Sequence, residues 1–441
     1  MTLDKVTPIV KDPKDNLYEK VDMVVIDEIS MVRADLMDCV DKFLRLNCSK
    51  NHLPFGGKQM VFIGDLYQLP PVIKGKEREI FRDHYPTPYF FSSRVFQELD
   101  MEFIELITVY RQKDEHFIDI LNAIRNKTIN QSHLEVLNDR YDPLSKPDED
   151  ELYVYLTPYN KQAHQINKEQ LQKIKGELFS YEGQIQGVFQ DRELPTEKDL
   201  SFKIQSQVML LNNDSEGRWV NGSVGKIVDV FEDDEGWDMI EVELSDGSVV
   251  NVEPFTWEIF EYRYNEKTGN LETETVGSFT QYPLRLAWAI TIHKSQGKTF
   301  NRVVIDIGKG TFSPGQMYVA LSRGTALEGI VLKKEIQKKH VFMDWRIIDF
   351  LTKYQYRLSD ERMPLEQKVD FLNKAIRENK NLEIVYLKSK DEKSKRVIKP
   401  HFVGDLLYKD KTFLGVEAYC YLRNETRNFR VDRILEMKSA E

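Results

Sequence analysis

The stretch "VDMVVIDEIS", Val21 to Ser30, sets the fold class of this chain. Its apolar run from Met23 to Ile26 leads directly into two adjacent carboxylates, Asp27 and Glu28. A continuous apolar run of this length is typical of a strand buried on both faces of a parallel sheet. Because ligands bind at the carboxyl ends of such strands, the acid pair stands where chemistry is expected.

The residues that follow continue the pattern of an α/β domain. A helix is predicted next, with its apolar face formed by Val32, Leu36, Val40, Phe43 and Leu44. A second apolar strand lies within "QMVFIGDLYQLPPV", residues 59–72, and ends at Gly64 and Asp65. The order strand, helix, strand predicts a doubly wound sheet with helices on its faces.

Composition indicates a globular protein of several domains. The chain has 441 residues, of which 41% are hydrophobic and 30% charged. Its net charge of −10 predicts no overall attraction to nucleic acid, although a local basic channel remains compatible with it. Three cysteines, Cys39, Cys48 and Cys420, lie far apart, so neither a disulfide framework nor a zinc site is expected. No signal peptide or membrane-spanning run is evident, and we expect a cytoplasmic protein.

Several polar residues stand at positions suited to phosphate chemistry. Of the acid pair, one carboxylate can hold Mg²⁺ while its neighbour orients or deprotonates water. Gln68 follows the second strand, Arg111 is predicted to end another strand, and Arg323 falls in the last turn of a helix beginning near Gln316. Each feature alone is more simply explained by a solvated loop, a surface ion pair or compensation of a helix dipole.

The series of motifs is more specific than any member of it. The chain carries, in order, "DEIS" from Asp27, "GDLYQLPP" from Gly64, "YRQ" from Tyr110, "TIHKSQG" from Thr291 and "YVALSR" from Tyr318. This series, from about residue 20 to residue 335, resembles the superfamily-one helicases of the Pif-one and RecD-like group. The resemblance implies two RecA-like domains, with ATP and Mg²⁺ between them and single-stranded DNA or DNA junctions as partner. It also implies movement in the 5′ to 3′ direction, a monomer, no membrane, and work in DNA repair and recombination.

The resemblance assigns roles to the residues already noted. Asp27 would be the Mg²⁺ carboxylate and Glu28 the base for water. Gln68 would couple the γ-phosphate to the DNA side of the first domain. Arg111 and Arg323 would be arginine fingers from the second domain, neutralising charge on the transferred phosphoryl group when the domains close.

The segment "TIHKSQGKTF", Thr291 to Phe300, ends like a phosphate-binding loop but is not one. The first glycine of G-x-x-x-x-G-K-[ST] would fall on Ile292, which cannot form the tight turn. The resemblance instead makes it a segment that grips the DNA backbone, with Gly297 allowing the turn and bordering the nucleotide. The DNA contacts expected here and in "LTPYNKQAHQIN" (156–167) are Thr157, Asn160, Thr291, His293, Lys294, Ser295 and Gln296. Such contacts bind DNA without regard to sequence.

The loop that cradles ATP is absent from the 441 residues. The remaining candidate, "NGSVGKIV" (221–228), has Ile227 where the Mg²⁺-binding hydroxyl belongs. We therefore expect weak or absent ATP and Mg²⁺ binding and a first RecA-like domain lacking its first strand and helix. Three explanations remain: the chain is the carboxyl-terminal portion of a longer helicase, a relic that binds DNA without hydrolysis, or a partner to a polypeptide that supplies the loop. We favour the first because the other motifs are undamaged.

Two β-rich regions complete the chain. Residues 187–280 alternate as short strands with an "NG" turn at Asn221 and a "DG" turn at Asp246, which predicts an inserted β-barrel, SH3-like by resemblance. Residues 369–437 resemble the WYL domain, an SH3-like fold that binds ligands or nucleic acid, with Thr412 to Leu414 in place of its name motif. A ligand face for a nucleotide or nucleic acid is expected at Tyr386, Arg396, Arg423, Arg427, Arg430 and Arg433. The alternative is outward charges on a small barrel.

These inferences divide the chain and leave two classes of function. The predicted parts are an incomplete first RecA-like domain (1–110), the second RecA-like domain (111–186 and 281–352), the inserted barrel (187–280), a linker (353–368) and the WYL domain (369–441). The leading hypothesis is an ATP-dependent DNA helicase. The alternative is a non-hydrolysing DNA-binding or regulatory protein whose WYL domain senses a ligand.

Overall fold

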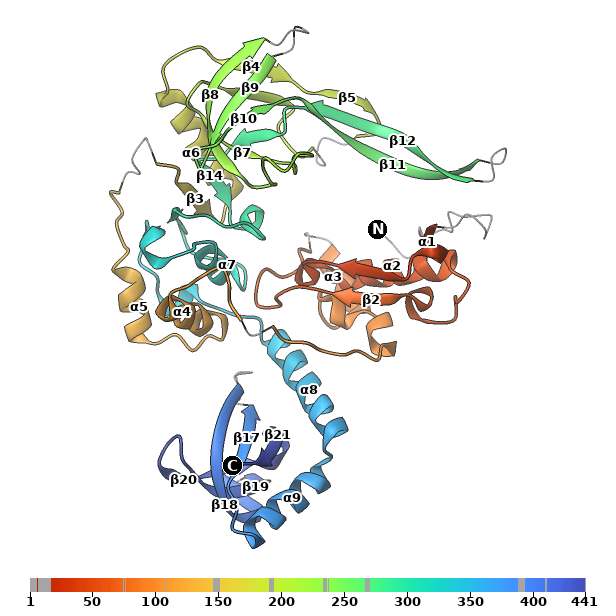
Figure 1. Ribbon diagram of the computed structural model, residues 1–441, viewed down its shortest axis with the longest axis vertical. Helices are drawn as coiled ribbons and strands as arrows, with labels where there is room; N and C mark the ends of the chain where they lie inside the picture. Colours follow the sequence, from red (N-terminus) through yellow and green to blue (C-terminus); the bar gives the residue numbers. More distant parts are fainter. Residues whose placement is uncertain are drawn as a thin grey trace. The chain divides into compact units, whose positions relative to one another are not determined.

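The computed structural model describes residues 6, 17–73, 75, 77–106, 108–145, 151–189, 194–232, 236, 238–265, 270–387, 393–408 and 411–440. The chain divides into a larger unit, residues 1–125 and 129–342, and a smaller unit, residues 126–128 and 343–441 (Figure 1). In the part of the chain just given, no helix is both long and apolar enough to cross a membrane.

The first sheet of the larger unit has the predicted βαβ order. Strand β1 (Met23–Ile26) pairs in parallel with β2 (Gln59–Phe62), and α2 (Ala34–Asn47) connects them. Helix α1 (Leu17–Lys20) precedes the sheet and α3 (Glu77–His84) follows it. Because both strands run the same way, their carboxyl ends place "DEIS" and "GDLYQ" at one edge.

The prediction that β1 is buried on both faces is wrong. The side chains of Met23 and Val25 are 46% and 54% exposed, and that of Ile63, just after β2, is 48% exposed. Among the described strands, β1 and β2 pair only with each other, so each has one edge without a strand partner. An apolar run is buried on both faces only where neighbouring strands and helices cover it.

Helix α2 is held by a buried polar residue as well as by apolar ones, and its predicted face is partly wrong. Leu36 is 42% exposed, whereas Met37 is fully buried. Asp38, 5% exposed, accepts hydrogen bonds from the Val95 backbone N–H (3.1 Å) and the Tyr85 hydroxyl (2.8 Å). Burial and the bond to Asp38 raise the pKa of Tyr85.

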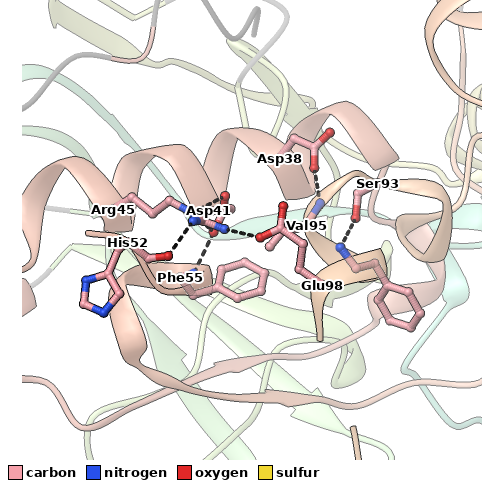
Figure 2. A network of polar contacts seen from close by, with 9 residues as sticks. Asp38, Asp41, Arg45, His52, Phe55, Ser93, Val95 and Glu98 are labelled. Atoms are coloured by element: carbon pink, nitrogen blue, oxygen red, sulfur yellow. Dashed lines mark hydrogen bonds and ion pairs between the residues drawn. The ribbon is translucent and has the colours of Figure 1, made fainter. Parts of the chain in front are cut away.

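A second carboxylate on α2 organises the loops around this helix. Asp41 accepts from the Phe55 backbone N–H (2.6 Å) and from Arg45, which also donates to Glu98 (2.8 Å) and to the His52 carbonyl (3.3 Å). Figure 2 shows these bonds joining α2 to the segment of His52 and Phe55 and to that of Val95 and Glu98. These hydrogen bonds and ion pairs therefore help to hold α2 and the loops around it in place, beside strands that are themselves partly exposed.

The second sheet is a four-stranded parallel sheet and is largely buried. Its order is β14 (Ala289–Thr291), β3 (Val154–Thr157), β15 (Val303–Ile305) and β16 (Ile330–Leu332). Helices α4 (Glu115–Arg125), α5 (Gln131–Asn138), α6 (Asn160–Lys173) and α7 (Gln316–Ser322) belong to the same region. All three residues of β14 and of β15 are buried, as expected for the core of a parallel sheet.

Arg111 does not end a strand, contrary to the sequence prediction. It lies in an irregular segment before α4, and the nearby Leu106 and Tyr110 are 88% and 86% exposed. With no strand described beside it, the apolar pattern of this segment finds no partner to pair with.

The inserted strands β4 to β13 form open sheets. The main one runs β10 (Val249–Val252), β9 (Asp238–Leu244), β8 (Val224–Glu232), β7 (Gln207–Leu210) and β13 (Leu284–Leu286). The "DG" turn joins β9 to β10 as predicted, with Gly247 at φ 83°.

The predicted closed barrel is not confirmed within the described strands. The long strands β11 (Phe255–Asn265) and β12 (Asn270–Gln281) pair with β5 (Gln184–Gly187) in a separate sheet, while β4 (Phe179–Glu182) pairs with β6 (Asp199–Phe202). Figure 1 shows the β11–β12 ribbon extending away from the main insert sheet. The β11–β12 ribbon does not pair with the main insert sheet. Strands β10 and β13 are therefore the two edges of the main sheet, and the described strands do not close into a barrel.

The smaller unit consists of two helices and an antiparallel sheet. Helices α8 (Trp345–Arg362) and α9 (Leu365–Arg377) occupy most of the predicted linker, residues 353–368. The sheet order is β20 (Glu425–Arg430), β19 (Lys411–Cys420), β18 (Lys393–Tyr408), β17 (Leu382–Leu387) and β21 (Ile434–Ser439), again without closure in the described strands. Leu372 on α9 packs on this sheet, with Ile384 and Val416, in one fully buried core.

Candidate functional site

The acid pair follows β1 in a strained turn. Glu28 has a left-handed backbone conformation (φ 48°, ψ 43°), and its N–H donates to Asp27 Oδ1 at 2.7 Å. A residue with a side chain in this region is destabilised by about 1–3 kcal/mol, and such strain is concentrated at functional sites.

Glu28 is joined to the segment predicted to grip DNA. Gln296 Nε2 donates to Glu28 Oε2 at 2.8 Å, across 268 positions of the sequence. Gln296 Oε1 is buried and has no hydrogen-bond partner among the described residues. Gly297, at φ 77°, lies beside the same carboxylate, since a Cβ there would be 4.0 Å from Glu28 Oε1. The structure thus brings the predicted base, a predicted DNA residue and the predicted nucleotide glycine together.

Arg323 is a buried cation without a carboxylate partner. Its side chain is 1% exposed and donates to the carbonyls of Val319 (3.0 Å) and Lys298 (3.1 Å) and to the Ser322 hydroxyl (2.9 Å). Within the described residues no carboxylate lies in ion-pair distance of it. Burial, and then the nearby Arg111, lower the pKa of Arg323 to about 10. A buried cation of this kind is destabilising unless an anion approaches it.

Arg111 and the Gln68 loop lie at opposite ends of α7. Arg111 Nη1 donates to the Ser322 carbonyl at 3.1 Å, at the end of the helix that carries Arg323. At its start, Gly315 (φ 76°) touches the loop of Gln68, because a Cβ there would lie 2.2 Å from the Gln68 carbonyl oxygen. Gln68 Oε1 is buried and lacks a hydrogen-bond partner in the described part of the chain. The short helix α7 therefore links the Gln68 loop to both arginines.

Four further residues of this region were missed in the sequence. Asp65 lies 3.8 Å from Arg125 Nε, whose guanidinium stacks 4.4 Å from the Tyr67 ring centre. Burial and Asp65, which also hydrogen-bonds its hydroxyl, raise the pKa of Tyr318. The available signal was position, because Asp65 lies three residues after β2, at the same end of the sheet as Asp27, which directly follows β1.

Two of the predicted DNA residues have no exposed surface. Thr157 and Ser295 are fully buried. The Thr157 hydroxyl donates to Gln162 Oε1 (2.6 Å) and the Ser295 hydroxyl donates to the Ile292 carbonyl (2.8 Å). A direct DNA contact through either hydroxyl does not fit this structure. Both hydroxyls instead stabilise the turns that present their neighbours.

Three of the predicted DNA residues, Asn160, His293 and Lys294, lie at or next to an aromatic cluster that the sequence did not reveal. Phe312, 54% exposed, stacks on Tyr159 at 5.4 Å and on His293 at 6.2 Å between ring centres. Asn160 is exposed beside Tyr159, and Lys294 is exposed beside His293. Burial lowers the pKa of His293, so its ring is neutral near pH 7. Exposed aromatic rings next to cations are what sequence-independent binding of single strands uses.

Thr291, the remaining predicted contact, supports this turn. It is 5% exposed, and its hydroxyl oxygen accepts from the Lys294 backbone N–H at 3.4 Å. The 3-10 turn His293–Ser295 follows at once, so Thr291 fixes where His293 and Lys294 project.

In the smaller unit, the predicted ligand face is corrected at Arg396. This side chain is 7% exposed and donates to Ser394 Oγ (3.0 Å), with its guanidinium 5.8 Å from the Phe429 ring centre. It belongs to the core because β18 turns it toward Phe429. Tyr386 also packs on Phe429, at 5.2 Å between ring centres.

The other arginines of that face differ in how far acids neutralise them. Arg427 pairs with Glu425 at 3.2 Å and Arg430 with Asp432 at 2.7 Å. The remaining two, Arg423 and Arg433, have no carboxylate within ion-pair distance in the described residues. The predicted face is therefore only partly cationic.

Comparison with known proteins decides the family. A PIF1-like helicase model matches residues 6–135, a UvrD-like helicase C-terminal model residues 286–331 and a WYL domain model residues 367–439. The ATP-dependent DNA helicase Pif1 of Campylobacter jejuni is 32% identical over 324 residues, covering 70% of this chain and 68% of that protein. This chain belongs to the Pif1-like helicase family. It is an enzyme by family, and its tail is a WYL domain.

Solved Pif1 structures have the same α/β helicase fold. Bacteroides Pif1 in complex with ADP-AlF4 is 36% identical, with a TM-score of 0.66 over 79% of this chain and 80% of that one. Bacteroides Pif1 bound to single-stranded DNA is 36% identical, with a TM-score of 0.61 over 79% and 81%. The chain spans about half the length of several other curated Pif1 relatives.

The residues present fit a nucleotide and its metal only in part. Asp27 suits Mg²⁺, which takes one or two carboxylates together with phosphate oxygens. No group of three or more possible metal ligands occurs in the described residues, so the phosphates would have to complete the shell. Arg111 is partly exposed and Arg323 is buried, and neither has a carboxylate within ion-pair distance among the described residues. The glycine-rich cradle is not among the 441 residues.

Proposed function

We propose that this chain carries the DNA-gripping and catalytic side chains of a helicase that uses ATP to move 5′ to 3′ along single-stranded DNA in the cytoplasm. The hydrogen bond between Gln296 and Glu28 carries the proposal. It connects a side chain on the DNA segment to the carboxylate placed to act on water. Nothing in a plain DNA-binding protein requires such a connection.

The roles follow from where each side chain lies. Asp27 holds Mg²⁺, and Glu28 accepts the proton of the attacking water. Bound MgATP supplies the phosphoryl group whose transfer to water drives movement. Arg111 and Arg323 neutralise charge on that group, which is favourable because burial has already removed water from Arg323. Gln68 senses the same group by donating from its Nε2, while its unpartnered Oε1 is available to accept from the attacking water.

Gln296 couples binding of the DNA strand to activation of the attacking water. While its amide donates to Glu28 Oε2, that oxygen is less available to accept from water. A strand held at His293 and Lys294 displaces the turn and, with it, Gln296. Water activation then depends on DNA.

Single-stranded DNA is held by exposed side chains from several elements. Asn160, His293 and Lys294 contact the backbone, while Tyr159 and Phe312 stack on bases. All of these contacts are independent of base sequence. In the WYL domain, Arg423 and Arg433 are the arginines left for an anionic ligand such as a nucleotide or nucleic acid.

A second function remains favoured by one observation. No glycine-rich phosphate loop occurs in the sequence, so turnover by these residues alone should be negligible. A protein that binds DNA without hydrolysis, regulated through its WYL domain, would need the DNA residues but not Glu28.

DNA binding and turnover test the proposal together. Anisotropy of a labelled oligo-dT should report salt-sensitive binding that weakens about tenfold or more in Phe312→Ala, since one stacked base contributes about 1–3 kcal/mol. Lys294→Ala should weaken it too, and Lys173→Ala on the exposed end of α6 should not. The absence of salt-sensitive binding by the unaltered chain would reject the proposal. Robust ATP turnover abolished by Glu28→Gln would reject only the expectation of negligible turnover.

A further inference from the structure

A pocket of about 360 Å³ lies in the larger unit between the inserted strands and the segment that follows Gln296. One wall is the loop from Val220 to Val224, which contains the "NG" turn, and the other runs from Gly297 to Arg302. None of the proposed catalytic or DNA-contacting side chains lines it. It shares one residue with the site described above, Gly297, which also borders the Glu28 carboxylate.

The lining combines an apolar side with a polar one. Leu152, Val154, Val224 and Phe300 form the apolar side, and the last three of these are at most 7% exposed. The hydroxyl and amide groups come from Ser223, Ser245, Thr299 and Asn301. No aspartate or glutamate is among the lining residues. A pocket of this size and character accommodates a small flat ligand with one anionic end.

Lys298 is seated in this pocket by the "NG" turn. Its Nζ donates to Asn221 Oδ1 at 3.0 Å. Gly222 (φ 106°) makes room for it, because a Cβ there would lie 2.8 Å from Nζ. In the part of the chain that the structure describes, no carboxylate lies within ion-pair distance of Lys298. Arg302, in contrast, is already paired with Glu151 at 2.9 Å.

The surroundings of Lys298 add to its lack of a counter-ion. Burial, and then the neighbouring Arg285, lower the pKa of Lys298. Arg285 on β13 has a buried Nε without a hydrogen-bond partner among the described residues. A cation held in position by a neutral amide, next to a second cation, favours an anion.

We propose that this pocket binds a nucleoside phosphate, with the phosphate on Lys298 and the base against the apolar side. Free inorganic phosphate would leave the apolar side uncovered. The nucleoside phosphate is either one unit of the bound single strand or a free nucleotide. The first source rests on the proposed DNA-binding function, and the second does not.

Occupancy of the pocket bears on the catalytic residues through the backbone. The carbonyl of Lys298 accepts from Arg323 Nη1, and Gln296, two positions earlier, donates to Glu28. A ligand that draws the Lys298 side chain away from Asn221 therefore acts on a segment that carries both contacts.

Three variants of the full chain test this. Lys298→Met removes the charge and keeps the stem, Gly222→Ala displaces the amine, and Lys173→Met is the matched control on exposed α6. One arm measures anisotropy of labelled oligo-dT over a salt series, and the other measures dTMP and AMP binding by calorimetry. Circular dichroism confirms that each variant is folded.

Two results would support the inference and identify the source. If a strand unit fills the pocket, Lys298→Met weakens oligo-dT binding about tenfold and lowers the salt slope by about 0.7. If a free nucleotide fills it, the unaltered chain binds dTMP or AMP, Lys298→Met abolishes this, and oligo-dT binding is unchanged. In either case Gly222→Ala should weaken the same binding as Lys298→Met does.

The opposite result is equally specific. If Lys298→Met and Gly222→Ala bind both probes as Lys173→Met does, the pocket assignment is wrong. Weakened oligo-dT binding by Lys294→Ala would then show that the proposed function survives this failure. If the unaltered chain binds no oligo-dT, the proposed function fails, and the mononucleotide arm alone decides the pocket.

Discussion

The two parallel sheets of the larger unit both contain short apolar strands, but these strands differ in how far they are buried. In the first sheet, β1 "MVVI" alternates between exposed and partly buried residues, while in the second, β15 "VVI" is buried throughout. The second sheet has four strands and a large apolar core. Among the described strands, the first has two, and its α2 is tied down by Asp38 and Asp41. An apolar run thus specifies a strand, whereas its neighbours specify burial.

The largest expected effect comes from truncating the same residue type in both sheets. Ile305 is 1% exposed and Ile63 is 48% exposed. Ile305→Ala should lower the free energy of unfolding by about 2–5 kcal/mol, because it leaves a cavity in a packed core. Ile63→Ala should lower it by less than about 1 kcal/mol. Urea denaturation followed by tryptophan fluorescence measures both, and equal losses would contradict the comparison.

The next effect concerns the buried hydrogen bonds that Asp38 accepts on α2, beside the first sheet. Asp38→Ala leaves the Val95 N–H and the Tyr85 hydroxyl buried without an acceptor, and should be destabilising by about 2–3 kcal/mol. Asp119→Ala on α4, whose carboxylate is 69% exposed beside His133, should change stability by less than about 1 kcal/mol. The same denaturation measurement applies. A small effect at Asp38 would mean that apolar contacts hold this region after all.

The smallest effect concerns the backbone strain at Glu28, in the turn that follows β1. Glu28→Gly and Glu28→Ala both remove the bond from Gln296, but only glycine adopts φ 48° without strain. Glu28→Gly should therefore be more stable than Glu28→Ala by about 1 kcal/mol. Thermal melting of the two variants side by side gives the difference. If alanine were the more stable, the left-handed turn would not be a source of strain.

Sequence reasoning succeeded where the signal was local. The order of β1, α2 and β2, the start of α7 at Gln316 and the "DG" turn all follow from residues close to one another. It failed where distant partners decide. Leu36 was expected in the core and is exposed, and Arg396 was expected on a face and is buried against Phe429. Neither outcome is encoded within a few residues of the position itself.

The candidate site divides in the same way. The acid pair and the "TIHKSQG" segment were recognised from their residues, but the bond between Gln296 and Glu28 joins positions 268 apart. The stack of Phe312 on Tyr159 and the pocket around Lys298 also bring together separate segments. No periodicity or spacing predicts such contacts.

The sequence by itself determined the chemistry available to this protein: carboxylates after a strand, cations and amides in one segment, and no phosphate-binding loop in the 441 residues. The reason is that residue type fixes charge and hydrogen-bonding capacity before any folding. Only the tertiary structure decided which groups meet and which are buried. Burial leaves Arg323 without a carboxylate partner among the described residues, and the contact between the segment after β14 and the turn after β1 places Gln296 on Glu28. Those contacts depend on packing between elements that the sequence keeps far apart.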